Sequence, residues 1–356
     1  MKRTSLLLGL AIIGQLLFSQ IPSGYYNPAN GLSGTALQQA LHNIIDDHDT
    51  QTYGALWNAF PNTDKKSNGK VWDVYSDVPG GTPPYQFTFY SDQCGNYGGE
   101  GDCYNREHTF PKSWFGGEVY PMNSDLFHIY PTDGYVNGKR SNFPFGEVGS
   151  ASWTSQNGCK VGSNNYPGYN GTVFEPIDAY KGDLARNYFY MASRYLGEDN
   201  SWPGSPMVNG SQPKEWALNM LFEWHKDDPV SQKEIDRNDA VYDIQDNRNP
   251  FIDHPEYVDM IWFNTAITDE GLLDRMNFNV YPNPVVDEIF VRVAGEASEG
   301  DLLISISDGS GRKVFSAEYK NQEIINIDAE NFSKGFYFLS ISKTDHTTPI
   351  VFKFVK

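Results

Sequence analysis

The chain has 356 residues, which at roughly 150 residues per domain corresponds to one to three domains. Its 27 Lys and Arg against 45 Asp and Glu give a net charge of −18, which excludes a protein that holds nucleic acid on a broad basic surface but not an enzyme with a local basic patch. The three cysteines exclude a disulfide-dense scaffold and a four-cysteine zinc site.

The N-terminus has the pattern of an export signal. Lys2 and Arg3 precede an apolar run from Leu6 to Phe18, and Ser19 is a small residue at which a peptidase could cleave. The run is shorter than the ~20 apolar residues that span a bilayer, which disfavours a membrane anchor. We therefore predict a signal peptide at residues 1–19, no membrane span, and a mature protein outside the cytoplasm.

Residues 20–270 form one compositional block without an internal repeat. The helical spacing of apolar residues predicts four helices, at 37–45, 182–196, 216–224 and 231–242. Between them lie stretches rich in Gly, Asn, Pro and Tyr, at 79–101 and 146–170. We expect these stretches to be long irregular loops that shape a functional surface. The block is predicted to be a mostly helical domain of the α+β class.

The C-terminal segment, residues 279–356, has a different texture. Alternating apolar residues predict short strands at 288–293, 302–307, 313–318, 323–327 and 336–341, with a turn at 308–311. This pattern predicts a small antiparallel β-sandwich. The segment has one histidine, His346, and no cysteine, so we expect the chemistry to lie in the first domain.

His108 is the strongest catalytic candidate among the seven histidines. It follows Arg106 and Glu107 directly, so a cation, a carboxylate and an imidazole can converge at a bent strand end before the break at Pro111. Further along the chain, residues 136–142 supply amides and cations within a short stretch. Residues 104–145 carry four positive and four negative side chains. This neutral segment would repel a polyanionic substrate less than the rest of the acidic chain.

These residue types suit the hydrolysis of a phosphodiester. A neutral imidazole can take the proton of an attacking water at neutral pH. Mg²⁺ prefers oxygen ligands and keeps several waters, so one Glu and one Asn carbonyl suffice on the protein side. Zinc would need clustered His or Cys ligands, which the sequence lacks. Mn²⁺ and Ca²⁺ share the preference of Mg²⁺ for oxygen and stay open as alternatives.

At these residues the chain resembles the bacterial endonuclease I family, which belongs to the ββα-metal, or His-Me finger, class. The matching motifs occur in the family's order, at 106–108, 125–131, 136–142, 174–176, 181–186, 188–191 and 247–251. The resemblance implies a secreted endonuclease that cleaves DNA, and often RNA, without sequence specificity and leaves a 5′-phosphate. It implies that His108 is the general base and that Glu107 and Asn137 are the protein ligands of Mg²⁺.

One part of the family pattern has no clear counterpart. Some members carry a basic insertion with an arginine that steadies the transition state, whereas here the stretch from His108 to Asn137 is short and contains no matching insertion. Arg106, Arg140 and Arg186 are the alternatives, and we take the first two as the catalytic candidates.

The C-terminal segment resembles the sorting domain of proteins exported by the type IX secretion system of Bacteroidetes. The resemblance rests on Tyr281–Pro284 (YPNP), Gly311–Lys313 (GRK) and Gly335–Tyr337 (GFY). It implies export through the periplasm to the medium or the cell surface, with the secretion machinery as partner. The alternative is an accessory β-domain that binds carbohydrate or packs on the catalytic part.

Two further hypotheses concern the cysteines and the function. In an oxidising compartment Cys94 and Cys103 would form a disulfide across a short loop, although a pairing of either with Cys159 stays open. The competing function is a non-catalytic surface-binding protein, because 15% aromatic residues would suit stacking on sugars or bases. A binding module has no reason to keep Glu107, His108 and Asn137 together, so their geometry separates the two functions.

Overall fold

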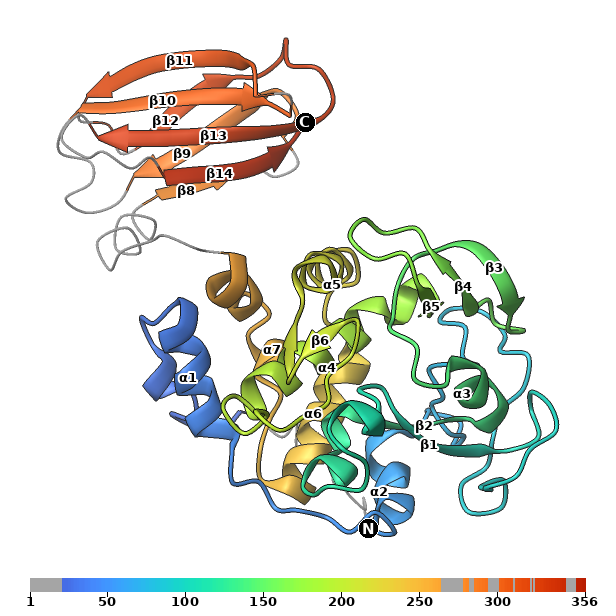
Figure 1. The fold of residues 1–356 in the computed structure, drawn as a ribbon. Helices are drawn as coiled ribbons and strands as arrows, with labels where there is room; N and C mark the ends of the chain where they lie inside the picture. Colours follow the sequence, from blue (N-terminus) through green and yellow to red (C-terminus); the bar gives the residue numbers. More distant parts are fainter. Residues whose placement is uncertain are drawn as a thin grey trace, which may run out of the picture. The chain divides into compact units, whose positions relative to one another are not determined.

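The computed structural model describes residues 21–263, 278–281, 285–293, 301–309, 311–320, 322, 324–343 and 350–356. The chain divides into two compact units, Met1–Phe263 and Asn264–Lys356 (Figure 1). The predicted signal peptide, residues 282–284 of the YPNP motif and His346 lie outside the described residues. Helices and small antiparallel sheets occur together, which confirms the α+β class. No helix in the described part of the chain is long and apolar enough to cross a bilayer.

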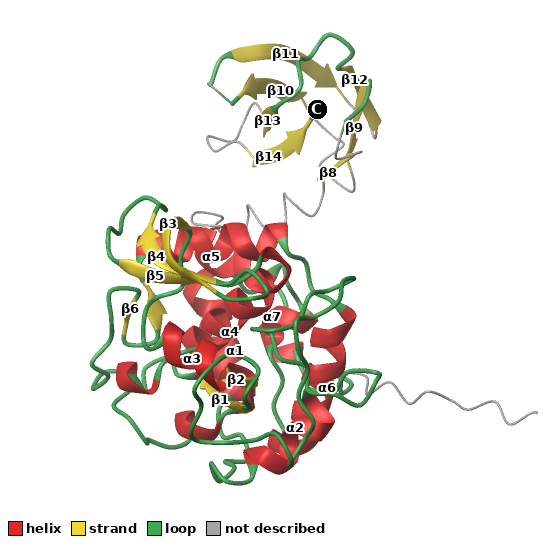
Figure 2. Ribbon diagram, turned by 90° about the vertical axis from the view of Figure 1, so that its right-hand side faces the viewer, coloured by secondary structure: helices red, strands yellow, loops and turns green. Residues whose placement is uncertain are grey.

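The first unit is built around one buried helix. The α-helices are α1 (Gly34–Ile45), α2 (Leu56–Thr63), α3 (Gly134–Arg140), α4 (Lys181–Arg194), α5 (Glu215–Asp227), α6 (Gln232–Gln245) and α7 (Pro250–Asp253). Every residue of α4 is buried, and α4 contacts α1, α5 and α7 (Figure 2). The four predicted helices are confirmed as α1, α4, α5 and α6, and α6 begins with a capping box formed by Ser231 and Glu234.

Two strands and a helix form a finger on this unit. Strand β1 (Tyr104–His108) pairs antiparallel with β2 (Ile129–Asp133), so that Glu107 lies opposite Tyr130. Helix α3 follows β2 without a loop, because the Asp133 carboxylate accepts a hydrogen bond from the Val136 amide at 2.8 Å and caps the helix. The finger therefore brings residues 104–108 and 134–140 into contact.

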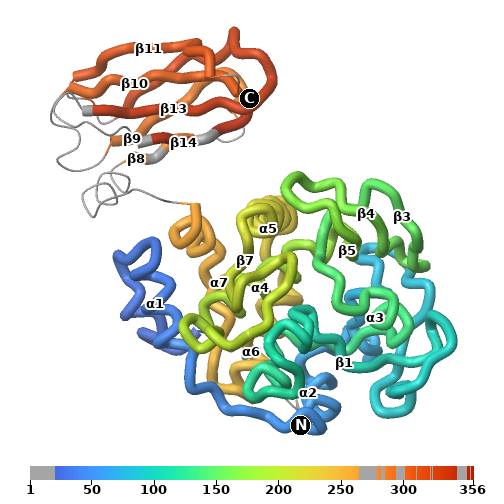
Figure 3. The backbone as a smooth tube through the Cα atoms, viewed as in Figure 1, coloured from blue at the N-terminus to red at the C-terminus, as the bar shows by residue number. Residues whose placement is uncertain are grey.

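The prediction of an irregular loop at 146–170 is largely wrong. Strands β3 (Val148–Thr154), β4 (Lys160–Asn164) and β5 (Thr172–Glu175) form an antiparallel sheet beside α3, where Trp153 contacts Tyr135 (Figure 3). Most of β3 is exposed, so the alternation that identifies a half-buried strand is missing. The other stretch, 79–101, holds no helix or strand, as expected. The remaining strands of this unit are β6 (Val208–Asn209) and β7 (Gln212–Pro213).

Short helical turns complete the first unit. Five are 3₁₀-helices and the last is a π-helix: Asn27–Ala29, Lys112–Trp114, Met122–Ser124, Leu126–His128, Asp178–Tyr180 and Asp259–Phe263.

The second unit consists of two antiparallel sheets that share a core. Their strands are β8 (Phe278–Tyr281), β9 (Glu288–Val293), β10 (Asp301–Asp308), β11 (Lys313–Lys320), β12 (Ile324–Asp328), β13 (Phe336–Lys343) and β14 (Ile350–Val355). The sheet orders are β11-β10-β13-β14 and β12-β9-β8. Val291, Ile304 and Leu339 are fully buried in the common core. The five predicted strands are confirmed with small shifts of their ends, whereas β8 and β14 were not among the predicted strands.

Candidate active site

The five residues predicted to act in catalysis or metal binding line one surface pocket of about 260 Å³. Arg106, Glu107 and His108 come from β1, and Asn137 and Arg140 come from α3. Tyr53 and the turns at Pro111–Ser113 and Ser141–Asn142 complete the wall. The finger thus unites the two sequence segments that carried the prediction.

His108 ends β1 with its imidazole held in one orientation. Its Nε2 lies 3.3 Å from the carbonyl oxygen of Asn123, and a carbonyl only accepts, so Nε2 carries the proton. Nδ1 is then the unprotonated nitrogen and makes no hydrogen bond to the described protein atoms. Burial lowers the pKa of His108 well below 6.5, and His128 and Lys112 lower it further. The ring is therefore a neutral base at pH 7.

Glu107 is a buried carboxylate, with only 2% of its surface exposed. The Tyr75 hydroxyl donates to its Oε1 at 2.9 Å, and Nη1 of Arg140 lies 3.2 Å from the same oxygen. Oε2 takes part in neither contact. Burial raises the pKa of Glu107 to about 7, against the opposing effects of Arg140 and Tyr75. A cation in the pocket would offset this cost of burial.

Asn137 presents its amide oxygen to the same pocket. Its Nδ2 donates to Oδ1 of Asn105 at 2.7 Å, which fixes the amide and leaves Oδ1 as the free acceptor. Glu107 and Asn137 thus supply a carboxylate and a carbonyl oxygen, the ligand types that hard divalent cations prefer. Clusters of three or more His, Cys, Asp or Glu are absent from the described residues, which disfavours a site with zinc-type ligands.

The three candidate arginines have different surroundings. Arg140 is 1% exposed and clamps the end of β1, because Nη1 donates to the His108 carbonyl at 3.0 Å and Nη2 to the Thr109 carbonyl at 2.6 Å. Arg106 stacks on the Tyr53 ring at 3.5 Å and is half-buried at the wall of the pocket. Arg186 is fully buried, pairs with Glu234 and does not line the pocket. The geometry thus favours Arg106 for contact with substrate and Arg140 for positioning.

The motif at 125–131 supports the site from behind. The His128 ring lies 5.5 Å from that of His108, and its Nε2 contacts the Met122 carbonyl at 2.7 Å. Asp125 accepts hydrogen bonds from the hydroxyls of Tyr190 and Tyr195 at 2.9 and 2.8 Å. These contacts fix the turn whose Asn123 carbonyl orients His108.

Three contributors escaped the sequence analysis. Tyr53 stacks with Arg106, Tyr75 donates to Glu107, and Asn123 accepts from His108. Each lies in a stretch without a recognisable motif and reaches the site by packing of distant segments. Lys112 also lines the pocket, and its position four residues after His108 was a usable signal in the sequence.

The cysteine pairing is resolved. Cys94 and Cys103 form a disulfide directly before β1, as predicted, while Cys159 is free and buried. Burial raises the pKa of the Cys159 thiol to about 12, so it is unreactive at neutral pH.

Two protein-family models and several known proteins match parts of this chain. Residues 33–256 match the family model described as Endonuclease I, and residues 279–355 match the secretion system C-terminal sorting domain. An extracellular ribonuclease of Bacillus amyloliquefaciens is 40% identical over 249 residues, which cover 67% of this chain and 78% of the relative. An extracellular ribonuclease of Bacillus subtilis (strain 168) is 37% identical over 249 residues, which again cover 67% of this chain and 78% of the relative. Endonuclease-1 of Buchnera aphidicola subsp. Baizongia pistaciae is 26% identical over 48% of this chain and 58% of its own length.

Proposed function

Because the chain belongs to the endonuclease I family, we propose that it is a metal-dependent endonuclease that hydrolyses phosphodiester bonds of DNA and RNA without sequence specificity. The protein is secreted or displayed at the cell surface, as its sorting domain and its extracellular relatives indicate. The observation that supports the proposed chemistry most is that Glu107, His108 and Asn137, from two separate segments, line one pocket.

The proposed reaction begins with a water molecule beside His108. Nδ1 of the neutral imidazole takes the proton of this water, and the water oxygen attacks phosphorus. The bond from phosphorus to the 3′-oxygen breaks, which leaves a 5′-phosphate and a 3′-hydroxyl that takes its proton from solvent. The Asn123 carbonyl keeps Nε2 protonated and the ring oriented throughout.

The Glu107 carboxylate and the Asn137 amide oxygen would hold the divalent cation, with Mg²⁺ as first choice and Mn²⁺ or Ca²⁺ as alternatives. When bound, the cation neutralises charge on the phosphate and on the departing 3′-oxygen. Arg106 and Lys112 line the same pocket and add positive charge for the substrate's phosphates. Arg140 holds the base and the carboxylate in register.

The alternative, a non-catalytic binding protein, gives no reason for this arrangement. It leaves unexplained why a buried carboxylate, a neutral imidazole and an amide oxygen share a pocket whose walls include three cations, Arg106, Lys112 and Arg140.

A plasmid-nicking assay with Mg²⁺ and with EDTA tests the proposal. We expect nicking that EDTA abolishes, and His108→Ala to slow it by roughly 10²–10⁴-fold, the usual contribution of a general base. His254→Ala is the matched control, because His254 does not line the pocket. Nicking in EDTA, or full activity of His108→Ala, would refute the mechanism.

We propose that the second unit addresses the protein to the type IX machinery. Removal of residues 279–356 is then expected to retain an active nuclease in the periplasm. Normal appearance of the shortened protein in the medium would count against this role.

A further inference from the structure

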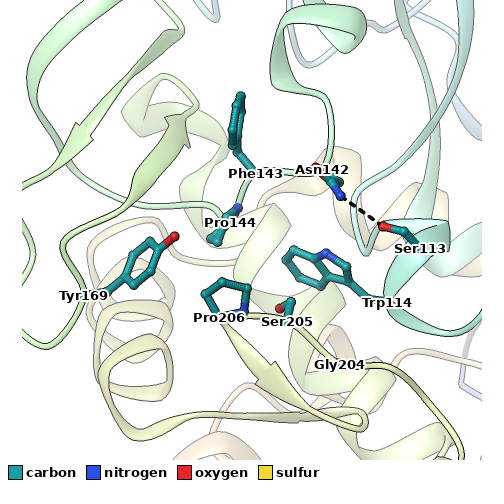
Figure 4. Close-up of a pocket in the computed structure, with 9 residues that line it drawn as sticks. All are labelled: Ser113, Trp114, Asn142, Phe143, Pro144, Tyr169, Gly204, Ser205 and Pro206. Carbon is teal, nitrogen blue, oxygen red and sulfur yellow. Dashed lines mark hydrogen bonds between the residues drawn. The ribbon is translucent and has the colours of Figure 1, made fainter.

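A second pocket of about 330 Å³ adjoins the catalytic one (Figure 4). Its walls are mainly apolar and aromatic, formed by Trp114, Phe143, Pro144, Tyr169 and Pro206. In Figure 4 the rings of Trp114 and Tyr169 lie on opposite sides of the pocket, with the two prolines between them. The pocket is therefore mainly apolar with an aromatic ring on each of two sides, which suits a planar group.

The two pockets are continuous. Ser113 and Asn142 line both of them, and Nδ2 of Asn142 donates to Oγ of Ser113 at 3.3 Å. Ser113 lies five residues after His108, and Asn142 lies five residues after Asn137. A polymer with its phosphate beside His108 can therefore continue directly into the second pocket.

The chemistry of the second pocket differs from that of the first. It has no charged side chain among its described lining residues, so it offers nothing to a phosphate. Trp114 is 3% exposed, and its indole nitrogen donates to no described protein atom. This nitrogen is not one of the fully buried polar atoms without a partner, so a ligand with acceptor atoms on a flat ring can accept its hydrogen bond.

The opposite wall is prepared for stacking. Tyr169 is half-buried, and its ring is stacked on Trp216 at 5.0 Å with an interplanar angle of 17°. The Trp216 indole donates to the Pro206 carbonyl at 3.1 Å, which ties this stack to the pocket wall. Little side-chain freedom is lost when a ring binds such a rigid platform.

We propose that this pocket binds the nucleobase of the nucleotide next to the scissile phosphate, so that the enzyme prefers unpaired strands over duplexes. The inference rests on the proposed nuclease function. A base within a duplex is stacked and paired and cannot enter the pocket, whereas the splayed bases of single strands stack readily on aromatic side chains.

The test combines one substitution with one change in the substrate. The substrate is a short single-stranded oligothymidylate with one scissile phosphodiester between methylphosphonate linkages, made with and without an abasic residue beside that bond. We expect Tyr169→Ala to lower kcat/KM on the intact strand by about 5- to 150-fold, the loss of one base–aromatic stack. It should change cleavage of the abasic strand and of a paired duplex by less than about twofold.

Matched variants separate stacking from general damage. Tyr169→Phe keeps the ring and should retain activity, and Tyr166→Ala, three residues earlier and outside the pocket lining, should behave as wild type. Trp114→Phe keeps the aromatic wall but removes the indole donor, and should weaken cleavage of the intact strand more than of the abasic one. Equal losses by Tyr169→Ala on all three substrates would overturn the inference.

A binding experiment keeps the two proposals distinguishable. In the His108→Ala background, anisotropy of a labelled oligothymidylate should show weaker binding when Tyr169→Ala is added or when the abasic strand is used, without a further loss when both are combined. If metal-dependent cleavage occurs at the same rate with Tyr169→Ala as with wild type, and with the abasic strand as with the intact strand, the base pocket alone is refuted. Base-dependent binding without any metal-dependent cleavage refutes the nuclease proposal alone.

Discussion

The charge on Glu107 is expected to destabilise the metal-free protein above neutral pH. Burial raises the pKa of this carboxyl from 4.5 to about 7, so the folded chain holds the proton more tightly than the unfolded chain. Between pH 4.5 and about pH 7 the folded state binds more protons than the unfolded state, so the free energy of unfolding falls as the pH rises. At 1.36 kcal/mol for each pH unit, the cost reaches about 3 kcal/mol at pH 8 and vanishes below pH 4.5.

Glu107→Gln removes this cost while keeping an oxygen that can accept from Tyr75. The quantity to compare is the free energy of unfolding of the variant minus that of wild type, measured in EDTA. This difference should be about 3 kcal/mol larger at pH 8 than at pH 4. This corresponds to a melting temperature roughly 6–12 °C higher for a unit of this size. All eight tryptophans lie in residues 57–262, so their fluorescence reports unfolding of the first unit in the full chain.

The control and the effect of metal sharpen the test. Glu118→Gln changes a carboxylate with 78% of its side chain exposed and should leave the pH dependence as in wild type. Added Mg²⁺ should stabilise wild type at pH 8 but not Glu107→Gln, since a ligand stabilises only the state that binds it. A difference between variant and wild type that is constant from pH 4 to pH 8 would refute the reasoning about Glu107.

Three further predictions concern the surroundings of the site. Asn105→Ala releases the Asn137 amide and should raise the Mg²⁺ concentration for half-maximal cleavage by roughly 10- to 100-fold, with activity regained at saturating Mg²⁺. A loss of activity that excess Mg²⁺ does not restore would contradict the orienting role of Asn105. Replacing Cys94 and Cys103 by serine should lower the free energy of unfolding by about 2–3 kcal/mol in denaturant titrations, and no change would contradict it. Arg237→Ala should cost about 3–5 kcal/mol in the same titration, because it leaves Asp64 buried without its partner; a loss under 1 kcal/mol would count against this.

The finger could be predicted because its chemistry is local in sequence. Residues 106–108 and 136–142 each carry several functional groups side by side, and the resemblance to the ββα-metal class implied that they belong to one site. The helices could be predicted for a related reason, since Leu37 and Leu41 repeat at helical spacing and are both buried in α1.

The remainder depends on contacts that sequence spacing does not encode. Tyr53 reaches Arg106 from 53 residues away, and Tyr75 reaches Glu107 from 32 residues away. Strand β3 is held by pairing with β4, where Gly162 lies so close to Ser150 that a Cβ atom would meet its carbonyl at 2.1 Å. Such close approach is a property of the assembled sheet and leaves no periodic signal.

Arg140 links the end of β1 to helix α3 through several contacts of one side chain. Its guanidinium contacts the carbonyls of His108 and Thr109 and the Glu107 carboxylate, so the proposed base and the proposed metal ligand are both tied to α3. New substrate preferences are therefore easier to reach by changes around Tyr169 and Pro206, which line the second pocket and not the pocket that holds His108.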